Sequence, residues 1–93
     1  MAMEVEDVLA SRLRIRIMKL LVQMSELNVS EIARRLGANY KTTSNHLELL
    51  GKEGILLHKQ FGRIRLYRIN EHSAKTKAIQ TLFEVWKTDR VEK

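Results

Sequence analysis

Hydrophobic residues recur at intervals of three and four through the first quarter of the chain, as in helices with one buried face. This pattern predicts a short helix over about residues 4–10 and a longer one over about 12–24, which Ser11 can cap. Apolar residues stand on more than one side of the longer segment, so we expect it to lie centrally and to be covered from two directions. Its polar stripe consists of Arg12, Arg16, Lys19 and Gln23.

Two further short helices follow, with a glycine between them. Asn28 can cap a helix of about 29–36, and Glu31 stands three residues later, as in a capping box. Gly37 is suited to end that helix, because glycine adopts the left-handed conformation freely. Asn39 can then cap the next helix. The apolar spine of this next helix is formed by three residues at spacings of four and three, namely Thr43 (by its methyl group), Leu47 and Leu50.

The period then changes from that of a helix to that of a strand. Residues 55–60 and 64–69 are rich in β-branched, aromatic and leucine residues, and a glycine-containing turn separates them. We expect that turn to consist of Phe61, Gly62 and Arg63. The helical period returns after Asn70, over about residues 71–88. The chain is therefore expected to be one mainly α domain over 1–93, with the order helix, helix, helix, helix, strand, strand, helix.

The basic charge is concentrated in the middle of the chain. The formal net charge is +6. Residues 34–68 include eight basic and two acidic residues, while the rest of the chain holds nine of each, so the middle segment carries the whole excess. A localised basic excess is typical of a protein that binds a polyanion. The alternative is a solvated surface that happens to be basic.

Two short helices joined by a tight glycine-containing turn form a helix-turn-helix, here over about residues 29–51. The second helix of this motif enters the major groove of DNA, and its first turns face the base edges. Small polar and hydrogen-bonding side chains crowd these turns, where a purely structural helix would have no use for them. We expect five of them to read bases: Tyr40, Lys41, Thr42, Ser44 and Asn45.

Other basic and polar residues flank this helix and are expected to contact the DNA backbone. Around the motif these are Arg34, Arg35, His46 and Lys52. The hairpin over about 55–69 reads as a wing that lies along adjacent phosphates or enters a minor groove, where arginine is favoured. Its expected contact residues are Lys59, Gln60, Arg63 and Arg65. Phosphate contacts would set register and affinity, and base contacts would set sequence preference.

These segments resemble the winged-helix regulators of the arsenic-repressor (ArsR) type. The resemblance lies in SRLRIRIMKLL, in the run Ser44-Asn45-His46-Leu47-Glu48-Leu49-Leu50, which fits S-x-H-L-x-x-L, and in FGRIRLYRIN. Regulators of the multiple-antibiotic-resistance (MarR) type share this fold. The resemblance implies a homodimer that binds a two-fold symmetric site in double-stranded DNA, usually as a repressor. It also implies that the terminal helices, about 4–10 and 71–88, form the dimer interface.

The apolar side of the last helix supports dimerisation independently, because it is too large to leave exposed on a small protein. The expected interface residues of both terminal helices are Val5, Val8, Leu9, Ile79, Leu82, Phe83 and Trp86. The alternative is that the last helix simply covers its own core.

One departure from the family concerns its metal sensor. Metal-sensing members carry a cysteine pair near the start of the first motif helix, and this chain has Leu27-Asn28-Val29-Ser30 there. Asparagine and serine are poor ligands for soft metals. The chain has no cysteine at all, and its histidines are not spaced as zinc ligands. We therefore expect no metal site and no cofactor, and the sequence assigns no small-molecule effector.

An enzyme is not expected, because the chain has no glycine-rich phosphate loop and no cysteine nucleophile. No apolar run approaches the roughly 20 residues of a membrane span, and no signal peptide is visible, so we expect a cytoplasmic protein. An archaeon or an archaeal virus would fit the composition. Three functions remain open: a sequence-specific regulator, an architectural DNA-binding protein with little sequence preference, and a winged-helix module that binds another protein.

Overall fold

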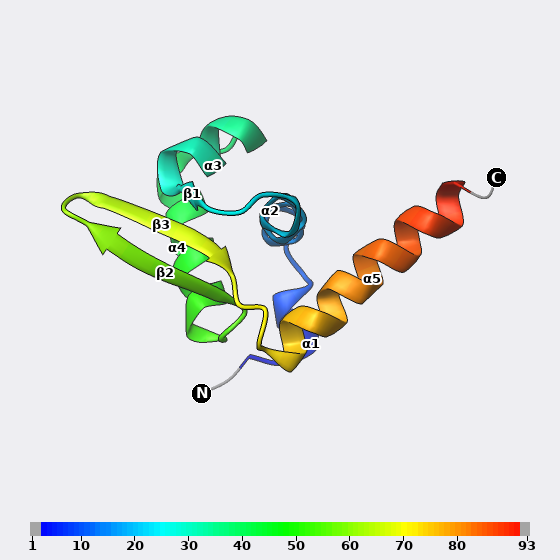
Figure 1. Cartoon of the computed structure of the whole chain (residues 1–93). Coiled ribbons are helices and arrows are strands. Elements are labelled where there is room, and N and C mark those ends of the chain that lie inside the picture. Colours follow the sequence, from blue (N-terminus) through cyan, green and yellow to red (C-terminus); the bar gives the residue numbers. More distant parts are fainter. Residues whose placement is uncertain (1–2, 92–93) are drawn as a thin grey trace.

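A computed structural model describes residues 3–91 and has the mainly α fold with one hairpin that the sequence predicts (Figure 1). Its elements are α1 (Val5–Val8), α2 (Arg12–Gln23), β1 (Leu27–Asn28), α3 (Val29–Leu36), α4 (Tyr40–Lys52), β2 (Leu56–Phe61), β3 (Ile64–Ile69) and α5 (Ala74–Val91). The strand β1 was not predicted, since two residues are too short to show a period. It pairs antiparallel with β3, which gives a three-stranded sheet of order β1-β3-β2.

The helix ends follow the capping residues of the sequence. Ser11, Asn28 and Asn39 are the N-caps of α2, α3 and α4, and each side chain accepts a hydrogen bond from the backbone N–H three residues later. Gly37 ends α3 with φ of 61°, the left-handed conformation that favours glycine. The two capping asparagines therefore set where both helices of the helix-turn-helix begin, and Gly37 sets where the first one ends.

The ends of the other elements differ by a few residues from the expectations. The hairpin turn has two residues rather than three, because Phe61 still belongs to β2 and pairs with Ile64. Gly62 has φ of 57° and Arg63 has no positive φ, as a type II′ turn requires. Helix α5 begins at Ala74, since the chain turns once between Asn70 and Ser73 before the helix starts.

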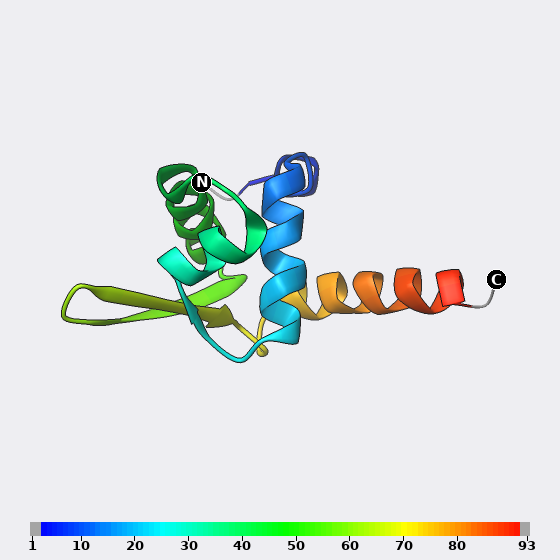
Figure 2. The same cartoon turned by 90° about the horizontal axis from the view of Figure 1, so that it is seen from above.

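Helix α2 lies at the centre of the molecule, as its apolar residues on several sides predict (Figure 2). Its residues Ile17, Met18 and Leu21 are fully buried. The other buried apolar residues come from α1, α3, α4, β2 and β3 and from the position just before β2: Val8, Val29, Ile32, Ala33, Leu47, Leu50, Ile55, Leu56 and Tyr67. One face of the sheet and the inner faces of α3 and α4 thus close on α2.

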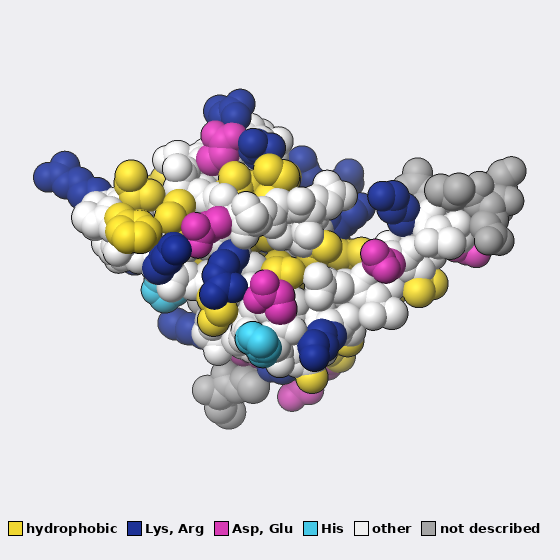
Figure 3. All heavy atoms as spheres, viewed as in Figure 1, with side chains coloured by type: hydrophobic (Ala, Val, Ile, Leu, Met, Phe, Trp, Pro, Cys, Tyr) yellow, Lys and Arg dark blue, Asp and Glu magenta, His cyan; other side chains and the backbone are white. Residues whose placement is uncertain are grey.

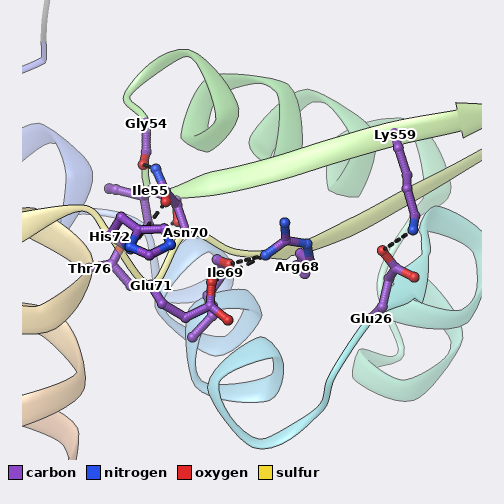
Figure 4. A network of polar contacts seen from close by, with 10 residues as sticks. All are labelled: Glu26, Gly54, Ile55, Lys59, Arg68, Ile69, Asn70, Glu71, His72 and Thr76. Atoms are coloured by element: carbon purple, nitrogen blue, oxygen red, sulfur yellow. Dashed lines mark hydrogen bonds and ion pairs between the residues drawn. The ribbon is translucent and has the colours of Figure 1, made fainter.

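Helix α5 is fastened at its first turn and then projects away from the core (Figures 1 and 2). The hydroxyl of Thr76 is buried and donates to the carbonyl of Ile55 at 3.1 Å. The amide of Asn70 donates to the carbonyl of Gly54 at 2.9 Å, so the segment before the helix is fixed as well (Figure 4). No local pattern predicts that Thr76 is buried, because a single threonine in a helix has no signature of its own.

Candidate nucleic-acid interface

Helix α4 has one buried and one exposed side, and this division positions the residues expected to read bases. Thr43, Leu47 and Leu50 are completely buried against α2 and the sheet, as the apolar spine predicts. The five predicted base-reading residues lie on the remaining surface, with Ser44 half-buried and four exposed: Tyr40, Lys41, Thr42 and Asn45. Since the core holds the spine, the helix can turn only this polar side towards a ligand.

The two arginines of α3 are held by a carboxylate on the same helix. Glu31 forms ion pairs with Arg34 and with Arg35, the second at 2.7 Å. The hydrogen bond from Arg34, and then that from Arg35, holds the pKa of Glu31 below its ordinary value. Within residues 3–91 the carboxylate of Glu31 accepts from these arginines and not from the backbone N–H of Asn28, so only the Asn28 half of the predicted capping box forms. Such exposed pairs are worth little in water, so both arginines can exchange the carboxylate for a phosphate.

His46 faces inward beside α2 rather than outward with the residues that are predicted to read bases. Its Nδ1 lies 3.0 Å from Nη1 of Arg14, whose guanidinium also donates to the backbone carbonyl of Asp7 at 2.7 Å. Burial, and then the charge of Arg14, lowers the pKa of His46 below its ordinary value. No sequence pattern predicts the contact between Arg14 and His46, since the two are 32 residues apart.

The wing carries its polar side chains close to the helix-turn-helix. Arg65 lies 3.3 Å from the carboxylate of Glu48 on α4, and Lys59 lies 3.5 Å from that of Glu26. The amide of Gln60 donates to the carbonyl of Gly62 across the turn at 3.0 Å. The Arg65 contact ties the outer part of the hairpin to the exposed side of α4, so wing and helix present one continuous surface.

Three of the basic residues in the middle segment form no ion pair within residues 3–91. Lys41 lies in the first turn of α4, Lys52 ends the same helix, and Arg63 stands in the hairpin turn. The other five basic residues of residues 34–68 are paired with nearby carboxylates. Cations without partners thus mark both ends of the polar helix and the tip of the wing.

A second surface lies between α2 and α5, where a groove of about 590 Å³ is open. Its apolar lining comes from Leu9, Ile15, Val22, Leu82, Phe83 and Trp86. Trp86 is 64% exposed, whereas Ile79 and Phe83 pack partly against the core. Val8 is only 5% exposed because it packs in the core of its own protomer, so its side chain is not available to a dimer interface. Val5, by contrast, is exposed.

The described residues contain no cluster that suggests a metal ion, since no three histidine, aspartate or glutamate side chains in residues 3–91 come together as ligands would. In the same part of the chain, no helix is both long enough and apolar enough to span a membrane. The stretch Leu27–Ser30 forms β1 and the start of α3, and Asn28 in it is already engaged as the cap of that helix.

Comparisons with a family model and with known proteins agree on one family. A family model described as "Bacterial regulatory protein, arsR family" matches residues 11–56. The arsenical resistance operon repressor of Escherichia coli (strain K12) is 30% identical over 83 residues, which cover 89% of this chain and 70% of that protein. Two of the segments that carry the resemblance, SRLRIRIMKLL and the run from Ser44 to Leu50, lie within residues 11–56. The third, FGRIRLYRIN, lies within the 83 residues aligned with the repressor.

Solved structures show the same fold. The homodimeric winged helix-turn-helix DNA-binding domain of a possible ArsR-family regulator from Mycobacterium bovis matches with a TM-score of 0.69 and 30% identity, over 95% of this chain and 76% of that one. HlyU from Vibrio cholerae matches with a TM-score of 0.73 and 26% identity, over 86% and 85%. The antimony-specific transcriptional repressor AntR, at 24% identity and a TM-score of 0.78, covers 94% and 77% and supports the fold alone.

Proposed function

The chain belongs to the ArsR family of bacterial regulatory proteins, which makes it a DNA-binding regulator rather than an enzyme, and we propose that it is a repressor that binds an inverted repeat as a homodimer. The observation that carries the proposal is the division of α4 into a fully buried spine and an exposed polar side, next to a wing whose tip holds an unpaired arginine. A regulator of this kind acts in the cytoplasm, where its DNA is.

In this proposal the exposed residues of α4 read base edges in the major groove. Lys41 and Asn45 are the side chains best suited to it, because lysine pairs with guanine acceptors and asparagine pairs with adenine through two hydrogen bonds. Arg34, Arg35 and Lys52 contact phosphates beside the groove, and Arg63 and Arg65 contact them from the wing. His46 acts indirectly, since its ring is already engaged by Arg14.

The groove between α2 and α5 is the place where a second copy docks. Leu82, Val85 and Trp86 are exposed on α5, and a patch of this kind on a small protein marks an interaction surface. The structure with a TM-score of 0.69 is a homodimeric domain of the same fold. In such a dimer two α4 helices would face successive major grooves, which requires half-sites with centres about 10 base pairs apart or a multiple of it.

The proposed function does not include a thiol-based sensor of metalloid ions. The Escherichia coli relative is an arsenical resistance repressor, and AntR is antimony-specific, but this chain of 93 residues contains no cysteine. Soft metalloid ions prefer thiolate ligands. We therefore do not propose arsenic or antimony ions as effectors of this chain.

A selection experiment tests the proposal. The protein is incubated with a pool of random DNA duplexes at near-physiological salt, and the retained duplexes are sequenced. An enriched inverted repeat supports the proposed repressor. Retention without any enriched motif would instead mean an architectural protein, and no retention even at low salt would remove DNA binding and favour a protein partner.

Substitutions then separate the two kinds of contact. Lys41→Ala and Asn45→Ala should lower affinity for the selected site while leaving affinity for random DNA almost unchanged, because each removes a base contact worth about 1–3 kcal/mol. Arg63→Ala should weaken both DNAs alike and reduce the log–log salt slope by about 1. Fluorescence anisotropy titrations on both duplexes measure this. Identical behaviour of all three variants on the two DNAs would refute the division into base and phosphate contacts.

A further inference from the structure

The tip of the wing carries a pair of exposed apolar side chains that phosphate binding does not explain. Phe61 is 60% exposed and Ile64 is 53% exposed. They are directly opposite each other in the antiparallel pairing of β2 with β3, so both project from the same face of the hairpin. Figure 3 shows hydrophobic side chains gathered over the end of the hairpin, with basic side chains beside them.

The remaining large exposed apolar residues already have a place in the proposed function. Tyr40 belongs to the exposed side of α4, and the others lie on the terminal helices that form the proposed dimer interface: Val5, Leu82, Val85 and Trp86. Phe61 and Ile64 belong to neither surface, since the hairpin extends to the opposite side of the molecule from α5 (Figures 1 and 2). A contact outside these two surfaces is needed to account for them.

The charges around the pair favour a polyanion as the molecule that it contacts. Arg63 lies between the two residues in the turn and has no ion pair in the described part of the chain. The ammonium of Lys59 lies over the ring of Phe61, 5.5 Å from its centroid. Arg65 projects from the other face of the hairpin, towards Glu48 of α4. Arg63 and Lys59 thus flank the apolar pair, which projects from the face of the hairpin opposite to the one that contacts α4.

We propose that Phe61 and Ile64 form an apolar wedge that enters the minor groove beside each half-site and packs against deoxyribose and base edges. This inference rests on the proposed function, because α4 must first bring DNA to the wing. Apolar side chains that enter a minor groove partly unstack a base step, which is least costly at flexible pyrimidine–purine steps. The wedge therefore adds a shape preference outside the bases that α4 reads.

The test compares wild type, Phe61→Ser, Ile64→Ser and Arg63→Ala on one selected duplex over a series of salt concentrations. Phe61→Ser should lower affinity about tenfold, in the range found when aromatic contacts to bases are removed. Ile64→Ser should also lower affinity, and both variants should leave the salt slope unchanged. Arg63→Ala should instead reduce the slope by about 1. Because Phe61 and Ile64 are exposed at the tip, both serine variants should fold normally, which circular dichroism checks.

A second readout is the sequence flanking the half-sites. Repeating the selection with Phe61→Ser should abolish any enrichment of pyrimidine–purine steps there while retaining the inverted repeat. If wild type and both serine variants bind with equal affinity and equal flanking preference, the wedge is refuted while the proposed repressor stands, and the patch belongs to a protein contact. If wild type retains no DNA at all, the proposed function and the wedge both fall.

Discussion

At the scale of single residues, Arg14 connects three helices, since it lies on α2 and contacts residues of α1 and α4. Its Nη2 donates to the carbonyl of Asp7 and its Nε to that of Val8, so it fixes the end of α1. Its Nη1 meets Nδ1 of His46 on α4. A neutral imidazole nitrogen can accept this hydrogen bond, whereas a protonated ring would place a second positive charge against the guanidinium. The contact therefore depends on the protonation state of His46.

This dependence predicts a loss of stability in mild acid. The folded state holds the pKa of His46 below 6.5, so the unfolded chain binds the extra proton first as pH falls. Stability should be full above about pH 6.5 and should decline below it, before the carboxylates of Glu31 and Glu53, whose pKa values are lowered from 4.5, begin to contribute. Urea unfolding between pH 7 and pH 5 measures the decline.

The matched variants are His46→Gln, which should remove the decline between pH 7 and pH 5, and His72→Gln at an exposed position, which should keep it. An equal pH dependence in wild type and His46→Gln would show that another group is responsible. The comparison isolates one side chain, because both variants replace a ring with the same neutral amide.

At the scale of elements, the two motif helices depend on local signals and on packing to different degrees. Helix α4 is held by its buried spine, yet its first turn carries exposed residues and is fixed by Asn39. The amide oxygen of Asn39 accepts from the backbone N–H of Thr42 at 3.0 Å. The hydroxyl of Thr43, also in this turn, is buried and finds no hydrogen-bond partner within residues 3–91. The cap is therefore a main support of the turn that would meet the bases.

Replacement of this cap should weaken both the fold and the proposed reading of bases. Asn39→Ala should lower the free energy of unfolding by about 1 kcal/mol, because one backbone N–H loses its acceptor, while Asn39→Ser should retain most of it. Urea denaturation measures the difference. Equal stability of the alanine variant and wild type would mean that the buried spine alone holds the first turn.

At the scale of the whole molecule, α5 makes the structure asymmetric. Only its first turns are fastened, through Thr76 and through Lys75, which lies 3.0 Å from the carboxylate of Glu53 at the end of α4. Beyond them the helix leaves the core with Leu82 and Trp86 exposed. The groove between α2 and α5 is large enough to take apolar side chains of a second copy. Through its contact with Lys75, Glu53 links α5, the proposed dimer helix, to α4, the proposed base-reading helix.

Charges placed on this surface should separate the proposed dimer. The double substitution Leu82→Glu and Trp86→Glu would bury carboxylates in an apolar interface, so the protein should become monomeric and should bind an inverted repeat far more weakly than wild type. Sedimentation velocity and anisotropy titrations measure both effects. Lys77→Glu, an exposed change on the same helix outside the groove, should remain dimeric. Persistence of the dimer in the double variant would place the interface elsewhere.

The fold class and the order of the main elements follow from the sequence, since periods, caps and turn glycines act over a few residues. Asn28 and Asn39 fix helix starts, and Gly37 fixes an end, whatever lies around them. The basic segment and the polar first half of α4 are likewise readable from the sequence alone, and their assignment to DNA contacts stays a prediction.

Only the tertiary structure decided which side chains are free. It pairs Arg34 and Arg35 with Glu31, turns His46 inward to Arg14, and buries Val8 in the core of its own protomer. It also adds β1 beside β3 and leaves Phe61 and Ile64 exposed at the wing tip. The pairing of Arg34 and Arg35 with Glu31 is local to α3. The other outcomes depend on how segments distant in the sequence pack together, and no local pattern encodes that packing. The sequence thus determined the elements, and packing determined the surface that they present.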